Sequence, residues 1–491
     1  MGLDIDRTEF SAADFERFSA KLRDNLAALK QVLARPGFGE GELSFGAELE
    51  LYIVNAQGEP LHRNQEVIAQ LDDPQLTLEL NRYNLEYNFS PVLLKDGCFA
   101  ATQREALAAL ARINACTRQW DGRAVPIGIL PTLQQADTGY HAMTPLRRFQ
   151  ALTKELIELR GGPFTIAIEG EDTLQLAMDD VSLEGANTSF QVHLRVPPSE
   201  FADFYNALQL VTPLVVAMAA NSPTLFGHRL WHETRIPLFK QSIDCRPKDG
   251  MHPIPARVNF GNNWVRSSAY ELFAEATMLY RPLLPICHAE DPLAIVRSGG
   301  TPKLHELRLH QGTIWLWNRP VFDPVDGGHL RIEMRALPAG PSIVDMLANA
   351  ALAIGLAKAL QGSIKDLLPA IPFAYCTANF YRAAQKGMDA ELFWPSARQS
   401  QPEYFSVPTI LKTLLPRLPE SLDAMGFRKD DVAPLLEVIA QRLETRQTGA
   451  QWQLDKLVEL RKDMHKREAL LAMLQQYQSN SDANIPVAQW R

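Results

Sequence analysis

The sequence feature that most limits the fold is the stretch "LSFGAELELYIV", residues 43–54. Its apolar residues recur at every second position, while Glu48 and Glu50 fall together on the opposite side. Successive side chains of a strand point to opposite faces of a sheet, so this pattern predicts a strand with one apolar face and one acidic face. Two carboxylates on one face repel each other, so they need either water or a bound cation beside them.

The same design recurs in four later segments, residues 78–81, 85–89, 190–196 and 330–336. Their polar side carries Glu79, Asn81, Glu86, Asn88, Gln191, His193, Arg195, Arg331, Glu333 and Arg335. Alternation of this kind is typical of an antiparallel sheet that packs on helices by one face, whereas a parallel sheet covered on both faces gives continuous apolar runs. The predicted fold class is therefore α+β, with a large antiparallel sheet backed by helices.

Helical patterns surround these strands. An amphipathic helix is predicted after Ser11, as its cap, with an end at Pro36 and Gly37, and two more helices are predicted with caps at Thr102 and Thr144. From about residue 389 onward the pattern is helical and charged. We therefore expect an N-terminal helix in residues 1–40, a sheet domain in 41–394 and a helical section in 395–491, with 479–491 poorly ordered.

Composition limits the classes of partner. The chain has 491 residues, and 49 basic against 57 acidic residues give a net charge of -8, which argues against nucleic acid or an anionic membrane as partner. Five scattered cysteines without a C-x-x-C pair argue against a disulfide framework or a zinc module and favour a reducing cytosol. The most apolar run, residues 208–220, is interrupted by Thr212 and Pro213 and is shorter than the roughly 18 residues of a membrane span, so it predicts a buried helix.

The acidic faces have two interpretations. Carboxylates and an imidazole two residues apart on a strand can bind one Mg²⁺ or Mn²⁺ ion from the same side. Alternatively, they are solvated residues on the outer face of a half-exposed sheet, although acidic residues are poor strand formers and here recur in strand after strand. Three other motifs are weaker: "SGGTPK" near Gly299 predicts a loop, His228 and His232 predict surface or hydrogen-bonded histidines, and Trp315 with Trp317 predict packing.

The order of motifs from Phe45 to Gln453 resembles the glutamate–cysteine ligase family 2, the carboxylate–amine ligases. The motifs are "FGAELEL", "LELNRYNLEYNFSP", "SFQVHLRV", "MAANSPTLFG", "TIWLWNRP", "RIEMRALPAGPSIVDMLANAAL", "ANFYRAAQKGMDAELFWP" and "TGAQWQ". The superfamily is similar to glutamine synthetase. The resemblance implies a curved antiparallel sheet whose inner face binds MgATP and a glutamate-like acid, with helices on the outer face.

The resemblance also implies roles for particular residues. It implies metal ligation by Glu48, Glu50, Glu79, Glu86, His193 and Glu333. Nucleotide contacts are implied for His193, Gln191 and Asn88, phosphate stabilisation for Arg335 beside Glu333, and substrate binding for Arg235. Gln191 stands where many members have histidine, and the segment after "NSP" departs from the common pattern, so the amine substrate is the least defined feature.

The activity implied by the resemblance is ATP-dependent joining of a carboxylate to an amine through an acyl phosphate. We expect γ-glutamylcysteine as the product, in the cytoplasm, from small-molecule substrates, with no nucleic acid or membrane partner and a possible homo-oligomer. Two alternatives stay open: a ligase that joins glutamate to a different amine, and a phosphotransferase on the same fold. A non-catalytic descendant is disfavoured because the carboxylates are retained.

Overall fold

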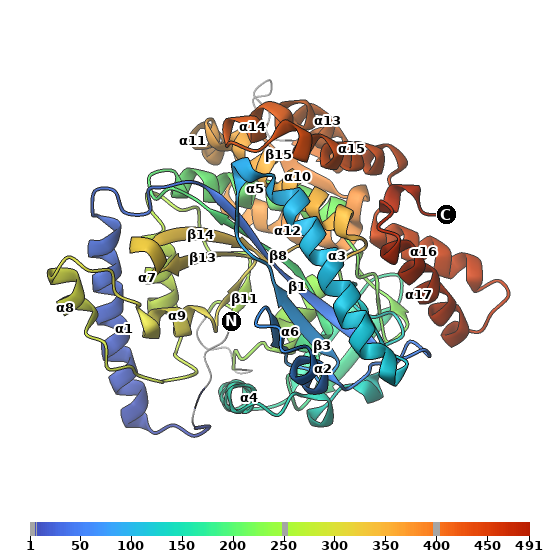
Figure 1. Cartoon of the computed structure of the whole chain (residues 1–491), viewed down its shortest axis with the longest axis horizontal. Helices are drawn as coiled ribbons and strands as arrows, with labels where there is room; N and C mark the ends of the chain where they lie inside the picture. The colour runs from blue at the N-terminus through green and yellow to red at the C-terminus, as the bar shows by residue number, and fades with distance from the viewer. Residues whose placement is uncertain (1–4, 6, 248–253, 396–402) are drawn as a thin grey trace.

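A large antiparallel sheet crosses the middle of the molecule (Figure 1). The computed structural model describes residues 5, 7–247, 254–395 and 403–491. The strand order is β13-β14-β8-β1-β3-β2, and every neighbouring pair is antiparallel. These strands are β1 (Ser44–Val54), β2 (Leu76–Leu78), β3 (Asn84–Asn88), β8 (Phe190–Arg195), β13 (Asn318–Asp323) and β14 (His329–Met334). The predicted α+β class with an antiparallel sheet is confirmed.

The central strand β1 is long enough to hold neighbours at both of its ends. The short strands β4 (Val92–Leu93) and β5 (Arg123–Val125) pair with its beginning and its end. The expected run 78–81 forms a strand only up to Leu78, so Glu79 lies just after β2.

Buried helices support the sheet from one side. Helix α5 (Phe201–Ala219) packs against α10 (Ile343–Gln361) and α12 (Phe373–Lys386). The Tyr205 hydroxyl donates to the carbonyl of Asn318 at 2.9 Å, which fixes α5 to β13. Both α5 and α10 are long and apolar enough to span a membrane, but 94% and 89% of the two apolar segments are buried inside the protein, as in the core helices of a globular domain.

The two ends of the chain form helical layers beside the sheet. Helix α1 (Ala12–Leu33) packs on α7 (Tyr270–Leu279), α8 (Pro292–Arg297) and α9 (His305–Gln311), at the left of Figure 1. Ser11 caps α1 in a reciprocal capping box with Asp14, as predicted. The C-terminal helices lie along the top and right of Figure 1: α13 (Val407–Leu414), α14 (Leu418–Ala424), α15 (Lys429–Thr445), α16 (Gly449–Leu460) and α17 (Lys466–Asp482).

The remaining elements connect these layers. They are α2 (Asn64–Leu71), α3 (Cys98–Thr117), α4 (Arg147–Arg160), β6 (Phe164–Glu169), β7 (Thr173–Met178), β9 (Thr224–Leu225), β10 (His228–Arg229), α6 (Arg235–Ser242), β11 (Val258–Asn259), β12 (Trp315–Leu316), α11 (Ile364–Leu367), β15 (Glu391–Trp394) and β16 (Glu403–Ser406). Strand β15 pairs with β16 across the predicted boundary at residue 395. The three-part division of the chain stays a prediction.

Two predicted helix caps are wrong for physical reasons. Helix α3 begins at Cys98, four residues before Thr102, because the carboxylate of the distant Asp431 accepts hydrogen bonds from the amides of Phe99 and Ala100. Helix α4 begins at Arg147, and the Thr144 hydroxyl donates instead to the carbonyl of Glu79 at 2.6 Å.

The expectation of a poorly ordered C-terminus is also wrong. Trp490 is buried against Trp452 and Tyr477 in edge-to-face contacts, and its indole N–H donates to the carbonyl of Ile485. A composition without a clear pattern at the end of a chain does not reveal such an aromatic anchor.

Candidate active site

Strand register places the predicted acidic residues on one face of the sheet. Glu48 lies opposite Asn88 on β3 and Gln191 on β8, and Glu50 lies opposite Glu86. Cross-strand neighbours share a face, so these side chains form a continuous polar row. One strand further along, Glu333 of β14 lies opposite both His193 and Arg319.

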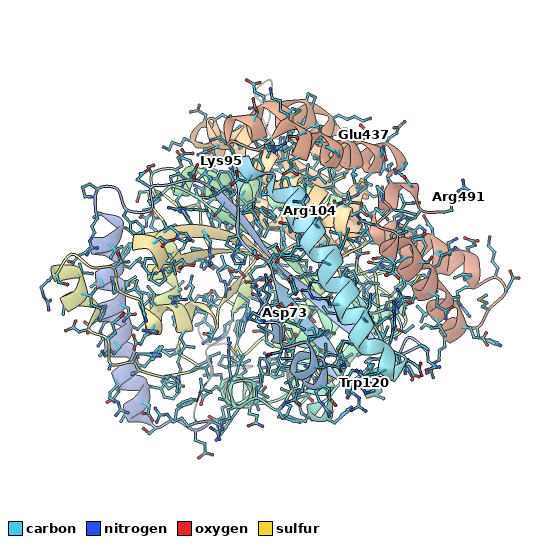
Figure 2. The ribbon with its side chains drawn as sticks, in the orientation of Figure 1. Asp73, Lys95, Arg104, Trp120, Glu437 and Arg491 are labelled. Atoms are coloured by element: carbon cyan, nitrogen blue, oxygen red, sulfur yellow. The ribbon has the colours of Figure 1, made fainter. Side chains whose placement is uncertain are left out.

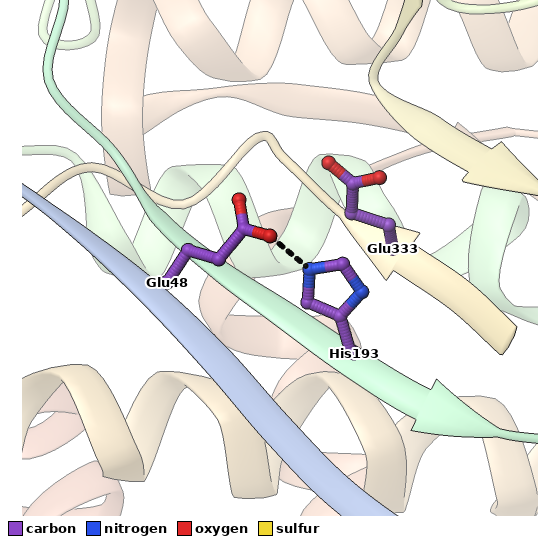
Figure 3. Close-up of side chains that lie close together, drawn as sticks. All are labelled: Glu48, His193 and Glu333. Carbon is purple, nitrogen blue, oxygen red and sulfur yellow. Dashed lines mark hydrogen bonds and ion pairs between the residues drawn. The ribbon is translucent and has the colours of Figure 1, made fainter. Parts of the chain in front are cut away.

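Three of these residues form what we call the first cluster: Glu48, His193 and Glu333. One ligand atom from each can be chosen so that all lie within 4.8 Å of one another. Figure 3 shows the three side chains converging from three neighbouring strands, with Glu48 Oε1 at 3.1 Å from His193 Nε2. Burial alone would raise the pKa of Glu48, but the charge and hydrogen bond of His193 lower it to about 2.

The second cluster consists of Glu50, Glu79 and Glu86, whose ligand atoms also lie within 4.8 Å of one another. Burial raises the pKa of Glu50 from 4.5 to about 7, and the charge of Glu86 adds to this effect. Burial, Glu86 and Glu50 raise the pKa of Glu79 well above its usual value. Burial and the charge of Glu48 raise the pKa of Glu86 in the same direction.

Both clusters fit a divalent cation of the Mg²⁺ or Mn²⁺ type. Carboxylate oxygens are the ligands that these hard ions prefer, and an imidazole is a suitable additional ligand for Mn²⁺. The second cluster contains three carboxylates with no arginine or lysine in ion-pair contact among the described residues, so a cation would relieve their mutual repulsion.

Glu333 differs from the other carboxylates because two arginines already hold it. Its carboxylate is fully buried and accepts from Arg319 Nε at 2.6 Å and Arg319 Nη2 at 3.0 Å, and it also contacts Arg335. Burial would raise the pKa of Glu333, but the two guanidinium groups hold it far below its usual range. Glu333 therefore holds the guanidinium groups of Arg319 and Arg335 beside the first cluster.

The two side-chain amides that were expected to contact a nucleotide donate hydrogen bonds to carboxylates in this structure. Gln191 Nε2 donates to Glu50 Oε1 at 2.8 Å, and its carbonyl oxygen accepts from Arg335. Asn88 Nδ2 donates to Glu86 Oε1 at 2.8 Å. Both amides orient members of the second cluster, and their contact with a nucleotide stays a prediction.

Arg235 is buried at the first position of α6. It is 2% exposed, pairs with Glu233 Oε1 at 3.2 Å and donates to the carbonyl of Ala336. Its charge still reaches the second cluster, because it lowers the pKa of Glu50 against the effect of burial. Its role in substrate binding stays a prediction, since the contacts that its guanidinium makes here are with Glu233 and Ala336 of the same chain.

The structure adds three charged residues that the sequence patterns did not identify: Arg148, Glu184 and Arg319. Arg319 precedes Pro320 in the motif with the two tryptophans, and only its register opposite Glu333 reveals it. Glu184 lies in a short 3-10 turn, where no alternation marks it, and burial together with the charge of Glu50 raises its pKa to about 8. Arg148 lies in the first turn of α4, where burial lowers its pKa and the charges of Glu79 and Glu86 oppose that shift.

The weaker sequence motifs supply no ligand to either cluster among the described residues. Trp315 and Trp317 are buried and meet Phe239 edge to face, so their interpretation as packing residues is confirmed. His228 is in β10, and the ring of His232 packs against Gly387. Neither histidine belongs to a metal-ligand group among the described residues.

Known protein families and solved structures include some that this chain resembles. The family model for glutamate–cysteine ligase family 2 matches residues 44–473. The structure is similar to a glutamate–cysteine ligase from Francisella tularensis in complex with AMP, with a TM-score of 0.54 and 11% identity over 90% of each chain. It also matches a bifunctional glutathione synthetase from Pasteurella multocida, with a TM-score of 0.45 and 10% identity over 94% of this chain and 55% of that one. No curated protein sequence matches significantly.

The match to the family model covers most of the chain, including every residue of the two clusters and the arginines that hold Glu333. The similarity to the solved ligase supports the fold. The chain therefore belongs to glutamate–cysteine ligase family 2 and is an ATP-dependent ligase that joins a carboxylate to an amine.

Proposed function

We propose that this enzyme activates the γ-carboxylate of glutamate with ATP and joins it to an amine, with cysteine as the preferred amine. The observation that carries the proposal is the presence of two three-ligand clusters on neighbouring strands, with Arg319 and Arg335 paired to Glu333 of the first cluster. Metal-ligating carboxylates beside fixed guanidinium groups are what phosphoryl transfer requires, because catalysis of that step is mostly positioning and charge stabilisation.

Mg²⁺ or Mn²⁺ is the proposed metal, with Glu48, His193 and Glu333 as one ligand set and Glu50, Glu79 and Glu86 as the other. When bound, such ions neutralise phosphate charge and polarise the transferring group. Gln191 and Asn88 hold Glu50 and Glu86 in place through hydrogen bonds, so the second ligand set is preorganised by the sheet.

The reaction needs two bond exchanges. A carboxylate oxygen of glutamate attacks the terminal phosphorus of ATP and releases ADP, which gives an acyl phosphate. The amine then attacks the acyl carbon, inorganic phosphate leaves, and the amine nitrogen loses a proton to give the amide. Arg335 is fixed by Glu333 and Gln191, so its remaining N–H groups are positioned to stabilise negative charge on the transferring group.

A second candidate is a ligase that joins glutamate to a different amine. The position of Arg235 favours this candidate. This residue was expected to bind substrate, but its guanidinium is buried and paired with Glu233, so the contacts that would select the amine differ from the expected ones. For either ligase we propose a cytoplasmic location, small-molecule substrates without nucleic acid or membrane partners, and assembly as a homo-oligomer.

The test is an amine screen with the purified enzyme, Mg²⁺, ATP and glutamate. We expect ADP release that depends on an amine, a hydroxamate when hydroxylamine is supplied, and γ-glutamylcysteine by mass spectrometry when cysteine is supplied. Another amide product would support the second candidate. A stable phosphorylated product without any amide would instead identify a phosphotransferase.

A further inference from the structure

A cavity of about 500 Å³ lies between α4 and the segment that precedes it, residues 140–145. Small-molecule sites in proteins have volumes of about 300–1,000 Å³, so the cavity is large enough for a ligand. Tyr140, Met143, Pro145 and Ile157 give it an apolar wall, and none of the residues of the two clusters lines it. The cavity is therefore a candidate binding site apart from the metal-ligand groups of the sheet.

One buried hydroxyl group in the wall of this cavity has no hydrogen bond. Thr153 lines the cavity and is 3% exposed, and its Oγ1 has no hydrogen-bond partner. The hydroxyls of Thr212 in α5 and Thr277 in α7 donate to the carbonyl four residues before them, which is the local bond that a helix offers to a threonine. Thr153 makes no such bond, although enclosing a hydroxyl without a partner costs free energy. A polar group of a ligand would supply the missing partner.

The rim of the cavity carries a negative charge that is not balanced. Lys154 and Glu158 both line the cavity and are exposed. Lys154 Nζ lies 3.0 Å from the carboxylate of Glu9, whereas Glu158 has no ion-pair partner in the part of the chain that the structure describes. The neighbouring Glu155 is 7% exposed, and the charge of Glu158 adds to the effect of burial in raising the pKa of Glu155. An ammonium group at the rim would balance these carboxylates, and an anion would be repelled.

The two polar groups of the cavity lie a fixed distance apart along α4. Thr153 and Glu158 are five residues apart on this helix, and a rise of 1.5 Å per residue separates them by about 7.5 Å along its axis. The lining between the unpaired hydroxyl and the unpaired carboxylate is largely apolar. A ligand that satisfies both groups therefore needs a polar atom at each end of a short apolar body.

We propose that this cavity binds a small amine whose apolar body ends in a hydroxyl group. The ammonium group pairs with Glu158, the apolar body packs against Tyr140 and Met143, and the hydroxyl group forms a hydrogen bond with Thr153. This site goes beyond the proposed ligation, because no residue of the two clusters belongs to it.

The experiment measures the binding of three probes to the full chain by calorimetry. Tyramine carries the ammonium group, the ring and the hydroxyl group, phenethylamine lacks the hydroxyl group, and 4-ethylphenol lacks the ammonium group. The variants are Thr153→Val, which keeps the shape of the side chain, and Glu158→Gln and Tyr140→Ala, which change exposed positions. The control is Glu437→Gln, which removes the same charge from an exposed position on α15 (Figure 2), while α4 lies at the opposite side of the molecule in Figure 1.

We expect tyramine to bind the wild-type enzyme at least about fivefold more tightly than either other probe, the effect of one added hydrogen bond or ion pair. Thr153→Val should remove the difference between tyramine and phenethylamine, and Glu158→Gln should remove the difference between tyramine and 4-ethylphenol. Tyr140→Ala should weaken all three probes, and Glu437→Gln should bind them as wild type does. The apo melting temperature of Thr153→Val should not fall, because its hydroxyl has no internal partner to lose.

Three results would overturn the site. The first is the absence of tyramine binding to the wild-type enzyme. The second is a set of probe affinities that Thr153→Val and Glu158→Gln leave unchanged, which would place the probes elsewhere. The third is displacement of tyramine by ATP with Mg²⁺, by glutamate or by cysteine, which would make the cavity part of the active site.

Discussion

Two carboxylates on the same sheet face have opposite surroundings. Glu333 is fully buried between Arg319 and Arg335, whereas Glu79 lies among Glu86, Glu50 and Glu184. The two arginines already balance the negative charge of Glu333. The negative charges around Glu79 are balanced only when a cation binds. Substitution of these two residues should therefore affect the apo protein in opposite directions.

Glu333→Gln should destabilise the apo protein by about 2–4 kcal/mol, because removing one partner leaves two partly buried guanidinium groups without their counter-ion. Urea unfolding at neutral pH measures the change. Glu42→Gln is the matched control, since the ion pair that Glu42 forms within the described part of the chain is an exposed one with Lys95. Wild-type stability of Glu333→Gln would show that the arginines do not depend on this carboxylate.

The second cluster predicts how stability depends on pH. The folded pKa values of Glu50, Glu79 and Glu86 are raised, so the folded protein binds protons more tightly there than the unfolded chain does. The stability that these groups contribute is fully present below the unfolded pKa of 4.5 and is lost as pH rises through the folded pKa of Glu50, about 7. Glu79→Gln should raise the apo melting temperature at pH 8 by about 1–3 °C, with a smaller gain at pH 5.

Thermal scans of apo protein from pH 5 to pH 8, with and without Mn²⁺, measure both effects. Stabilisation by Mn²⁺ should increase with pH in wild type, because ligands must lose their protons to bind the ion, and it should be smaller in Glu79→Gln. A pH-independent effect of Mn²⁺ would place the ion elsewhere.

For single residues, the sequence predicted which side chains share a face of the sheet but not which side chains they contact. The two-residue repeat places Glu48, Glu50 and Glu333 correctly, because side-chain direction in a strand is a local property. Arg148 and Glu184 were missed because a helix start and a 3-10 turn reach the site only through the tertiary fold. Arg319 was missed because its pairing with Glu333 depends on strand register across β13 and β14.

Individual elements depend on contacts that are distant in the sequence. Helix α16 begins at Gly449 with Thr448 as cap, and an added Cβ at Gly449 would lie 2.1 Å from Asn221 Oδ1. That oxygen also accepts from Gln453 Nε2 at 2.9 Å. The "TGAQWQ" motif therefore docks α16 against the end of α5, and only the structure reveals this close approach.

Gly449→Ala should destabilise the enzyme by about 1–3 kcal/mol, because the extra methyl group displaces Asn221 from its hydrogen bonds. Chemical denaturation measures the loss. Gly362→Ala is the control, since its Cβ would meet nothing within 4 Å and its φ of -66° suits any residue. Equal stability of the two variants would contradict the proposed docking role.

The whole molecule is joined by polar groups that cross from the C-terminal helices into the core. Arg442 of α15 is 1% exposed and pairs with Asp345 of α10 at 2.7 Å, and it also contacts the Met218 carbonyl of α5. The hydroxyl of Tyr477 in α17 donates to the carbonyl of Pro126 at 2.9 Å. Unfolding of either side alone would break these buried contacts, so the proposed section 395–491 should unfold together with the sheet domain.

Calorimetry of the full chain should therefore show a single unfolding transition. Arg442→Met should lower the temperature of that transition without splitting it, because loss of one member of a buried pair costs about 3–5 kcal/mol and the cost is shared by both sides of the contact. Loss of ADP-forming activity should follow the same transition. A separate low-temperature transition in Arg442→Met, with activity retained above it, would show instead that the C-terminal helices are an independent domain and that the sheet with its two clusters folds without them.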